Sequence, residues 1–291
     1  MKIFVTGASG FVGSAVVKEL IGAGHQVTGL ARSEQSAKAI RDAGAEVLNG
    51  TLEDLQVLRE GAANADGIIH TAFIHDFTQY AKANQTDSAA INVMGEAIGG
   101  TNKSMVVTSG LLGVTGQKGI ITEESRAVNS PRSSEAAALA LADRGVNASV
   151  VRLPPSVHDK GDKGFVPFII GLARAKGFSA YPASGSNRWS AVHRLDAAKL
   201  FRLAIEKGAA GALYNAIGDH SIEMKTIAEL IGSKLNLPTR SVSGDELAKH
   251  YGWMSGFIGM DCPATSVQTQ QQLEWNAMEI GLLQDMEQHY F

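Results

Sequence analysis

The sequence predicts an α/β fold in which a doubly wound, mostly parallel sheet of seven strands is accompanied by a smaller, discontinuous lobe. Short apolar runs alternate with stretches of helical periodicity up to about residue 158, which is the pattern of repeated βαβ units. A glycine-containing turn joins the first apolar run to the first helical stretch. Glycine is also abundant, at 32 of 291 residues against roughly 7% in average composition, which suits a fold with many tight turns.

The first strand and the first helix flank a turn with three glycines. The apolar run 3–5 is followed by Gly7, Gly10 and Gly13, after which helical spacing continues to residue 20. Gly7 permits the turn, Gly10 lets a phosphate approach the backbone, and Gly13 lets the helix pack closely on the strand. Backbone N–H groups and the positive end of the helix dipole then face a site for a pyrophosphate, unless the glycines serve only a tight turn. We expect the dinucleotide to contact Gly7, Ser9, Gly10, Phe11 and Val12.

The end of the second expected strand, residues 25–31, indicates which dinucleotide binds. Sites for NAD usually place a carboxylate here to accept from the ribose 2′-hydroxyl, whereas an Arg accommodates the 2′-phosphate of NADP. Arg32 and Ser33 follow the strand, and no carboxylate occurs before Glu34. The sequence therefore predicts that NADP(H) is preferred over NAD(H), with a solvated surface role for Arg32 as the alternative.

The chain then alternates helices at 36–43 and 55–63 with strands at 46–50 and 66–72. Residues 73–77 leave the sheet at its carboxyl edge, where open α/β sheets bind ligands. His75 in this loop could serve as an acid, a base or a substrate contact, or lie on a polar surface. A crossover helix is expected at 86–98, a strand at 105–109, a helix at 135–142 and a strand at 147–153.

The segment Thr6-Gly-Ala-Ser-Gly-Phe-Val-Gly13 resembles the fingerprint of the extended and atypical short-chain dehydrogenase/reductases, a group that includes the NAD-dependent epimerase/dehydratases. The resemblance implies a Rossmann-type sheet and a nicotinamide dinucleotide. The loop 50–54 stands where the family has Gly-Asp-Leu-x-Asp beside the adenine, with Thr51 in place of the Asp. Residues 70–72 resemble the strand end beneath the nicotinamide ribose, and 153–158 a turn against the nicotinamide. The implied cofactor contacts are Thr51, Leu52, Thr71, Ala72, Phe73, Leu153 and Pro154.

The same resemblance implies a catalytic hydroxyl at the end of strand 105–109. The family keeps a Ser or Thr there that hydrogen-bonds the substrate carbonyl, in most members the third of three, and the third residue here is Gly110. Ser109 is the better candidate and Thr108 the second. Alternatively, both hydroxyls satisfy backbone groups at the strand end.

The family's proton donor, the Tyr of Tyr-x-x-x-Lys, has no counterpart in this chain. Four residues after each of the tyrosines at 80, 181, 214 and 251 stand Asn, Gly, Gly and Ser. Counted back from Glu135, the Tyr and Lys positions fall at Ala127 and Pro131. Arg132 could orient a substrate anion or contact the nicotinamide ribose in place of the Lys. Because an Arg is too basic to donate a proton, the proton must come from His75, a hydroxyl relay or water.

The dinucleotide-binding domain is expected to span 1–158, completed by 192–218, and the substrate lobe 159–191 and 219–291. Helices are expected at 166–175, 197–206, 224–235, 245–252 and 268–273, with a seventh strand at 211–217 and an irregular segment at 181–189. Residues 192–196 resemble the family's Val-His-Val-x-Asp, in which Asp196 would cap the helix that follows. The resemblance to extended members of the family implies that this part of the chain roofs the substrate site, where Arg188, Trp189 and His193 would face the substrate, although Trp189 could equally be a core residue.

Composition excludes several classes of function. The net charge of −3 is scattered along the chain, so no basic stripe is offered to nucleic acid. Cys262 is the single cysteine, so neither an intrachain disulfide nor a Cys-based metal site is expected. No metal-ligand spacing occurs, and no apolar run approaches the length of a signal peptide or a membrane span. We expect a cytoplasmic protein without membrane contact, and the family resemblance implies a homodimer.

These observations favour an NADPH-dependent reductase of a small carbonyl compound, an aldehyde or a ketone. The alternative from another class is an NADP(H)-binding sensor or regulatory protein without catalysis, which the absent Tyr and Lys favour. Epimerase or dehydratase chemistry on a nucleotide sugar is the second alternative, although those enzymes also use the Tyr.

Overall fold

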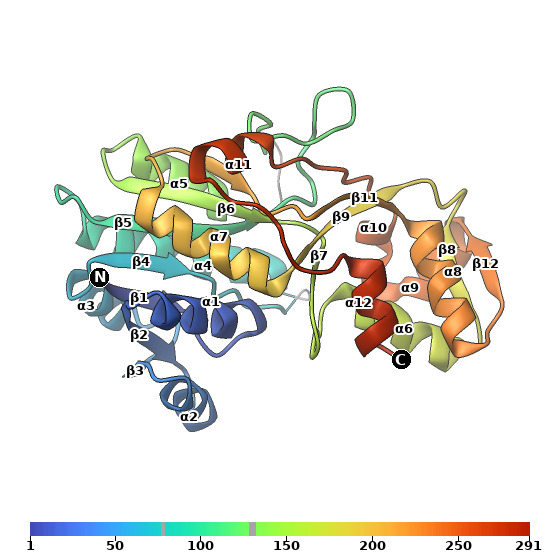
Figure 1. Ribbon diagram of the computed structural model, residues 1–291, viewed down its shortest axis with the longest axis horizontal. Coiled ribbons are helices and arrows are strands. Elements are labelled where there is room, and N and C mark those ends of the chain that lie inside the picture. The colour runs from blue at the N-terminus through green and yellow to red at the C-terminus, as the bar shows by residue number, and fades with distance from the viewer. Residues whose placement is uncertain (77–78, 128–131) are drawn as a thin grey trace.

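The structure, a computed structural model, describes residues 1–76, 79–127 and 132–291 (Figure 1). The strands are β1 (Lys2–Thr6), β2 (Gln26–Ala31), β3 (Glu46–Asn49), β4 (Gly67–His70), β5 (Ser104–Gly110), β6 (Asn147–Leu153), β7 (Ser156–His158), β8 (Ser179–Pro182), β9 (Arg188–His193), β10 (Leu213–Asn215), β11 (Asp219–Glu223) and β12 (Thr239–Val242). The helices are α1 (Phe11–Gly22), α2 (Glu34–Asp42), α3 (Leu55–Ala63), α4 (Tyr80–Ala97), α5 (Ser134–Ala142), α6 (Phe165–Lys176), α7 (Arg194–Lys207), α8 (Met224–Leu235), α9 (Gly244–Tyr251), the 3₁₀ turn η2 (Gly252–Met254), α10 (Ser255–Ile258), α11 (Val267–Leu273) and α12 (Leu282–His289).

A seven-stranded sheet forms the centre of the larger lobe, as predicted. Its strand order is β10-β6-β5-β4-β1-β2-β3, and every neighbouring pair is parallel. From β1 the chain first adds β2 and β3 on one side and then β4, β5, β6 and β10 on the other. The order therefore reverses between β1 and β4, and ligands of open α/β sheets bind at the carboxyl edge beside such a reversal.

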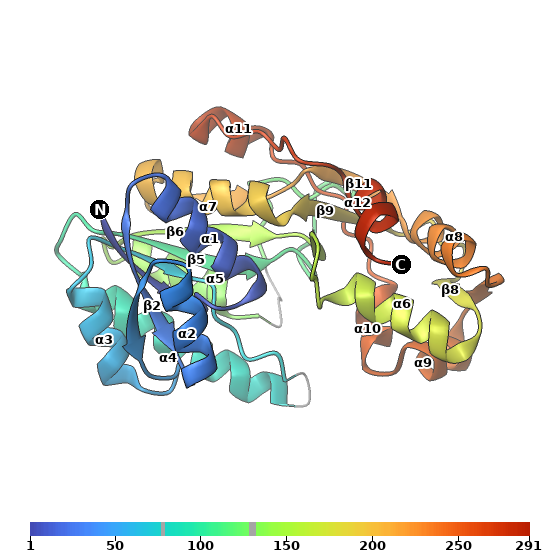
Figure 2. The same cartoon turned by 60° about the horizontal axis from the view of Figure 1, so that its bottom comes forward.

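Alternation along the strands divides the sheet into two apolar faces. Ile3 and Val5 of β1 pack in one core cluster with α1, α2 and α7, whereas Phe4 packs on the opposite face with α3, α4 and α5. Successive strand residues point to opposite faces, so buried runs such as these are apolar on both sides. The sheet is consequently covered by helices on both faces (Figure 2).

The smaller lobe lies beyond the carboxyl ends of the strands, on the right in Figure 1. A three-stranded sheet, β11-β9-β7, connects it to the large lobe, and β12 pairs with β8 in a second small sheet. The expected irregular segment 181–189 therefore contains the ends of two strands, β8 and β9. Local pattern did not indicate them because their partners lie far away in the sequence.

Two further expectations differ from the structure. Helix α4 begins at Tyr80 rather than at residue 86. In its first turns the Asn84 side chain donates to the Tyr80 carbonyl at 3.0 Å and accepts from the Ser133 amide at 3.1 Å. Asp196 does not cap α7. The cap is His193, whose Nδ1 accepts from the Leu195 amide.

The chain crosses back to the large lobe near its carboxyl end. Leu273 and Trp275 belong to the core cluster of α1 and α7, although 219–291 was expected to form part of the substrate lobe. The Trp275 Nε1 donates to the Asp196 carbonyl at 3.0 Å, and the Asp196 carboxylate accepts from the amides of Met278 at 2.9 Å and Glu279 at 3.0 Å. Asp196 thus has a structural role, which is to hold this crossing.

Within residues 1–76, 79–127 and 132–291, no helix has the length and apolar content needed to cross a membrane. The same residues include no cluster of three or more His, Cys, Asp or Glu side chains that could hold a metal ion.

Candidate active site at the carboxyl edge of the sheet

The glycine turn between β1 and α1 has the shape that a dinucleotide pyrophosphate requires. Gly7 has φ +71°, and a Cβ there would lie 2.7 Å from the Ala72 amide nitrogen. A Cβ on Gly13 would lie 2.1 Å from the Gly7 carbonyl oxygen, so only glycine permits this approach of helix to strand. Ser9 and Gly10 are exposed at the start of α1, whose first turn has no carboxylate. The first amides of α1 therefore lie next to exposed backbone, at the positive end of the helix dipole, which fits a bound phosphate.

Arg32 and Ser33 lie at the end of β2 as predicted, and Arg32 is exposed. Ser33 is the N-cap of α2 and accepts from the Ser36 amide at 3.2 Å. Glu34, the nearest carboxylate in sequence, is paired with Arg41. The strand end therefore presents a cation and a helix N-terminus rather than an uncompensated carboxylate.

The loop after β3 is ordered by Asp54. Its carboxylate accepts from the Thr51 amide at 2.7 Å and from the Thr51 hydroxyl at 2.8 Å, and the backbone bond, then the hydroxyl, lower the pKa of Asp54. A cavity of about 110 Å³ lies next to this loop and is lined by Glu53, Ile74, Asp76, Gln79, Lys82 and Ala83.

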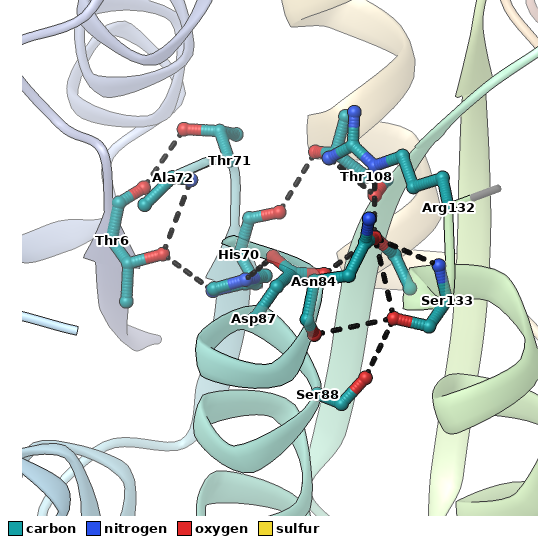
Figure 3. Close-up of polar contacts among 11 residues, drawn as sticks. Thr6, His70, Thr71, Ala72, Asn84, Asp87, Ser88, Thr108, Arg132 and Ser133 are labelled. Carbon is teal, nitrogen blue, oxygen red and sulfur yellow. Dashed lines mark hydrogen bonds and ion pairs between the residues drawn. The ribbon is translucent and has the colours of Figure 1, made fainter. Parts of the chain in front are cut away.

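A chain of buried hydrogen bonds crosses the carboxyl edge from β1 to α5 (Figure 3). Thr6 Oγ1 lies 2.7 Å from His70 Nδ1, and His70 Nε2 lies 3.0 Å from Asp87 Oδ1 on α4. Asp87 Oδ2 accepts from the Ser134 hydroxyl at 2.6 Å, and Ser134 Oγ accepts from Arg132 Nε at 2.8 Å. Thr6, His70, Asp87 and Ser134 are each at most 1% exposed. We give the name polar chain to these four residues together with Arg132.

Strand alternation explains why polar groups gather on one face of this edge. Four apolar strand residues pack in the core cluster beneath α3, α4 and α5, namely Phe4, Ile68, Val107 and Val150. Each of them lies two positions before a polar residue, in the same order Thr6, His70, Ser109 and Arg152. Because side chains two apart on a strand share a face, the four polar residues point from the sheet toward α4 and α5. His70 and Arg152 contact Asp87 and Glu135 there.

Charges along the polar chain balance each other. Burial alone would raise the pKa of Asp87, but the hydrogen bond and charge of His70, with the charge of Arg132, hold it below its ordinary value. Burial lowers the pKa of Arg132, which the negative charge of Asp87 opposes. Since an Arg titrates far above neutral pH, Arg132 remains a cation and Asp87 an anion.

The two candidate hydroxyls at the end of β5 have different surroundings. Thr108 Oγ1 donates to the His70 carbonyl at 2.8 Å, which is the backbone role given above as the alternative. Its own carbonyl accepts from Arg132 Nη2 at 3.4 Å. Ser109 is 3% exposed and points toward α4 and α5. Of the two, Ser109 shares a face with the polar chain.

The loop after β4 brings Phe73 and His75 next to Arg132. The Arg132 Cζ lies 4.2 Å from the centroid of the Phe73 ring, and the His75 ring centroid lies 5.4 Å from that of Phe73. Desolvation, and then the charge of Arg132, lower the pKa of His75. Tyr80 also joins this group, with its ring centroid 5.9 Å from that of Phe73, although sequence spacing indicated no role for it.

The loop that carries the family's Tyr position is anchored by Arg152. Its guanidinium binds both carboxylate oxygens of Glu135, at 2.6 and 2.7 Å, and the carbonyls of Ser125 at 2.7 Å and Thr122 at 3.3 Å. Ala127 packs against the core of the small lobe. The expected Lys position, Pro131, lies outside the described residues.

The three predicted substrate residues do not join this group. The Arg188 guanidinium donates two hydrogen bonds to Asp261, at 2.6 and 3.0 Å. Trp189 is 0% exposed in the small-lobe core, which is the alternative role considered for it. His193 caps α7, and its Nε2 lies 3.6 Å from Asp159 Oδ1.

The carboxyl end of β6 and the start of α7 flank the glycine turn. Leu153 packs against the core cluster of α1 and α7, and Pro154 is buried. Arg194 lies 4.6 Å from the Phe11 ring centroid and donates to Asp159 at 2.7 Å.

Sequence reasoning missed His70, Asp87, Tyr80 and Ser134. One local signal was available. Asp87 falls at helical spacing with the apolar residues Ala83, Ala90 and Met94, and an Asp on an apolar helix face is almost never fully buried without a partner.

Comparisons with known proteins agree with this architecture. A model of the NAD dependent epimerase/dehydratase family matches residues 3–98. An uncharacterised protein of Schizosaccharomyces pombe is 46% identical over 289 residues, which cover 98% of each chain. A 4-hydroxy-2-methyl-3-oxo-4-farnesyl-3,4-dihydroquinoline-1-oxide ketoreductase of Stigmatella aurantiaca is 28% identical over 79% of this chain and 72% of its own. A dTDP-glucose 4,6-dehydratase of Bacillus anthracis, solved with NAD, superposes with a TM-score of 0.76 at 19% identity, over 100% of this chain and 96% of its own. The chain therefore belongs to the NAD-dependent epimerase/dehydratase family, among the extended and atypical short-chain dehydrogenase/reductases.

Proposed function

We propose that this protein uses NADPH to reduce a small carbonyl compound, an aldehyde or a ketone. The observation that carries the proposal is the polar chain, which connects Thr6 beside the glycine turn to Arg132 beside the end of β5. A dinucleotide site and a group of polar side chains thus occupy one edge of the sheet, at the reversal of strand order. The ketoreductase relative supports reduction as the reaction class.

The residues at the glycine turn fit a nicotinamide dinucleotide. The first amides of α1 would bind its pyrophosphate, and Arg32 would bind the 2′-phosphate that distinguishes NADP. Thr71, Ala72 and Phe73 would lie beneath the nicotinamide ribose, and Leu153 and Pro154 against the nicotinamide. When bound, the reduced cofactor supplies the hydride.

Ser109 and Arg132 would act on the substrate carbonyl. The Ser109 hydroxyl donates a hydrogen bond to the carbonyl oxygen, and the Arg132 cation stabilises the negative charge that develops there. Arg132 is held in place by Phe73 and Ser134, so little reorganisation is required when that charge appears. Thr108 supports the arrangement through its bond to the His70 carbonyl.

The test is NADPH consumption across a panel of aldehydes and ketones, with NADH run in parallel. We expect consumption with NADPH, and a fall in kcat of about 100-fold in Ser109→Ala, which is typical when one such donor is removed. Ser149→Ala is the matched control, because Ser149 is also 3% exposed but lies on β6 with its neighbours 148 and 150 facing the opposite side. Equal activity in both variants would contradict the role of Ser109.

The absent Tyr-x-x-x-Lys motif keeps a second function in view, that of an NADP(H)-binding sensor. Calorimetric binding of NADPH without consumption by any carbonyl compound would establish the sensor in place of the reductase. Nucleotide sugars belong in the same panel, because the solved dehydratase shares this fold. Conversion of a nucleotide sugar without net NADPH consumption would indicate epimerase or dehydratase chemistry instead.

A further inference from the structure

We propose that Tyr80 is the general acid of this site and that Arg132 takes the place of the family's Lys beside it. The proposal rests on the proposed carbonyl reduction and supplies the proton that this reaction needs. The pair comes from two elements, the first residue of α4 and the residue two positions before α5, instead of from one helix.

Both groups contact the ring of Phe73. The Arg132 Cζ lies 4.2 Å from the Phe73 ring centroid, and the Tyr80 ring centroid lies 5.9 Å from it at an interplanar angle of 59°. The two are also close enough to interact electrostatically. Burial lowers the pKa of Arg132, and its electrostatic interactions, first with Asp87 and then with Tyr80, raise it.

Contacts between α4 and α5 fix the relative position of the pair. Asn84 donates to the Tyr80 carbonyl at 3.0 Å and accepts from the Ser133 amide at 3.1 Å. The Ser133 hydroxyl lies 2.7 Å from that of Ser88, one turn further along α4. The start of α4 is therefore bonded to the residue that follows Arg132. A Tyr-x-x-x-Lys motif obtains the same proximity from the rise of a single helix.

The other candidate donor is less suited to the task. Desolvation and the Arg132 charge lower the pKa of His75, so at neutral pH the imidazole is largely without the proton that an acid must give. A phenol carries its proton at neutral pH. The adjacent guanidinium attracts the phenolate that remains after transfer, as Coulomb's law requires.

The proposed step balances in atoms and electrons. The carbonyl carbon accepts a hydride from the reduced nicotinamide, and the π electrons of the C=O bond move to the oxygen. That oxygen takes the Tyr80 hydroxyl proton, so an O–H bond of the phenol breaks as the O–H bond of the alcohol forms. The substrate is reduced, the dinucleotide is oxidised, and water returns the proton to the phenolate.

The experiment compares Tyr80→Phe with Tyr181→Phe. Tyr181 is the matched control because it also lies next to a cation, with Lys225 Nζ 5.9 Å from its ring centroid, but on β8 of the small lobe. We expect kcat to fall about 100-fold or more in Tyr80→Phe, the usual contribution of a positioned acid, and to stay unchanged in Tyr181→Phe. The NADPH Kd by calorimetry and the Tm should be the same in both variants and the wild type.

Two additional readouts separate chemistry from structure. The alkaline fall in kcat of the wild type should disappear in Tyr80→Phe, because water then supplies the proton. Arg132→Lys should retain more activity than Arg132→Gln, because it keeps the charge beside the phenol.

The outcomes distinguish this inference from the proposed function. Carbonyl reduction by the wild type at a rate that Tyr80→Phe matches would overturn the inference and leave the reductase standing. A loss of NADPH binding or of Tm in Tyr80→Phe that parallels its loss of activity would assign Tyr80 a structural role and also overturn it. A wild type that binds NADPH but reduces no carbonyl compound would remove the proposed function, and the role of Tyr80 with it.

Discussion

Asp87 is the central residue of the polar chain, because it accepts from both His70 and Ser134. In Asp87→Asn the single amide oxygen can face either His70 or Ser134, so one of the two buried donors loses its acceptor. A buried donor in that state costs about 1–3 kcal/mol. We expect urea denaturation at neutral pH to show a loss of this size. Asp42→Asn is the control, since the surface pair of Asp42 with Lys38 is worth about 0.5 kcal/mol or less.

The same variant should change the pH dependence of stability. The pKa of Asp87 is lower in the folded protein than its ordinary value, so the unfolded chain binds the proton first as pH falls. The contribution of the ionised Asp87 carboxylate to the free energy of unfolding is complete above the ordinary carboxyl range near pH 4. It is lost as the pH falls through the lowered pKa of Asp87 in the folded protein. The free-energy difference between wild type and Asp87→Asn should therefore shrink on acidification. A difference that stays constant from neutral pH to about pH 3 would contradict the ionised state of Asp87.

At the scale of one element, α1 depends on the closeness of its first turn to β1. A Cβ on Gly13 would lie 2.1 Å from the Gly7 carbonyl oxygen, so Gly13→Ala forces the helix away from the strand. Overpacking of this kind costs about 1–3 kcal/mol, and calorimetry should show weaker binding of NADPH because the amides of the turn move. Gly22→Ala, at the other end of α1, places its Cβ in open space and should be neutral or slightly stabilising. Full NADPH affinity in Gly13→Ala would show that the turn does not bind the pyrophosphate.

Elements that depend on local signals were predictable from the sequence. The bounds of β6, α3 and α8 agree with the expectation, and the glycine turn has the conformation its spacing predicts. Strands β8 and β9 were missed because they pair with β12, β7 and β11, which apolar alternation in one segment cannot reveal.

The candidate site was predictable only in part, for a related reason. The search for a Tyr with a Lys four residues later assumes that both side chains lie on one helix. Tyr80 and Arg132 come from α4 and the approach to α5, more than fifty positions apart, and the bonds of Asn84 that bring them together appear only in the folded protein. His70 and Asp87 likewise meet through the packing of α4 on β4.

At the scale of the whole molecule, the two lobes share their stability through the crossing near the carboxyl end. Trp275 is 0% exposed in the large lobe, whereas Trp189 and Trp253 lie in the small lobe. Trp275→Phe removes the Nε1 bond to Asp196 and should cost about 1–3 kcal/mol. Because the chain passes between the lobes several times, we expect the fluorescence of the two remaining tryptophans and the far-UV circular dichroism to shift together to lower denaturant.

Trp253→Phe provides the control for this experiment, since Trp253 is 46% exposed and its replacement should leave the midpoint almost unchanged. A Trp275→Phe variant whose fluorescence transition stays at the wild-type midpoint, while circular dichroism shifts, would show that the lobes unfold separately.

The position of Leu273 and Trp275 in the large lobe also bears on how the chain is made. The apolar layer above the central strand β1 is sealed by side chains that are synthesised some 270 positions after that strand. Until those residues emerge, a nascent chain exposes part of that layer, and incomplete cores of this kind are prone to aggregation. Chaperone engagement during translation should accordingly persist until Leu273 and Trp275 have been synthesised.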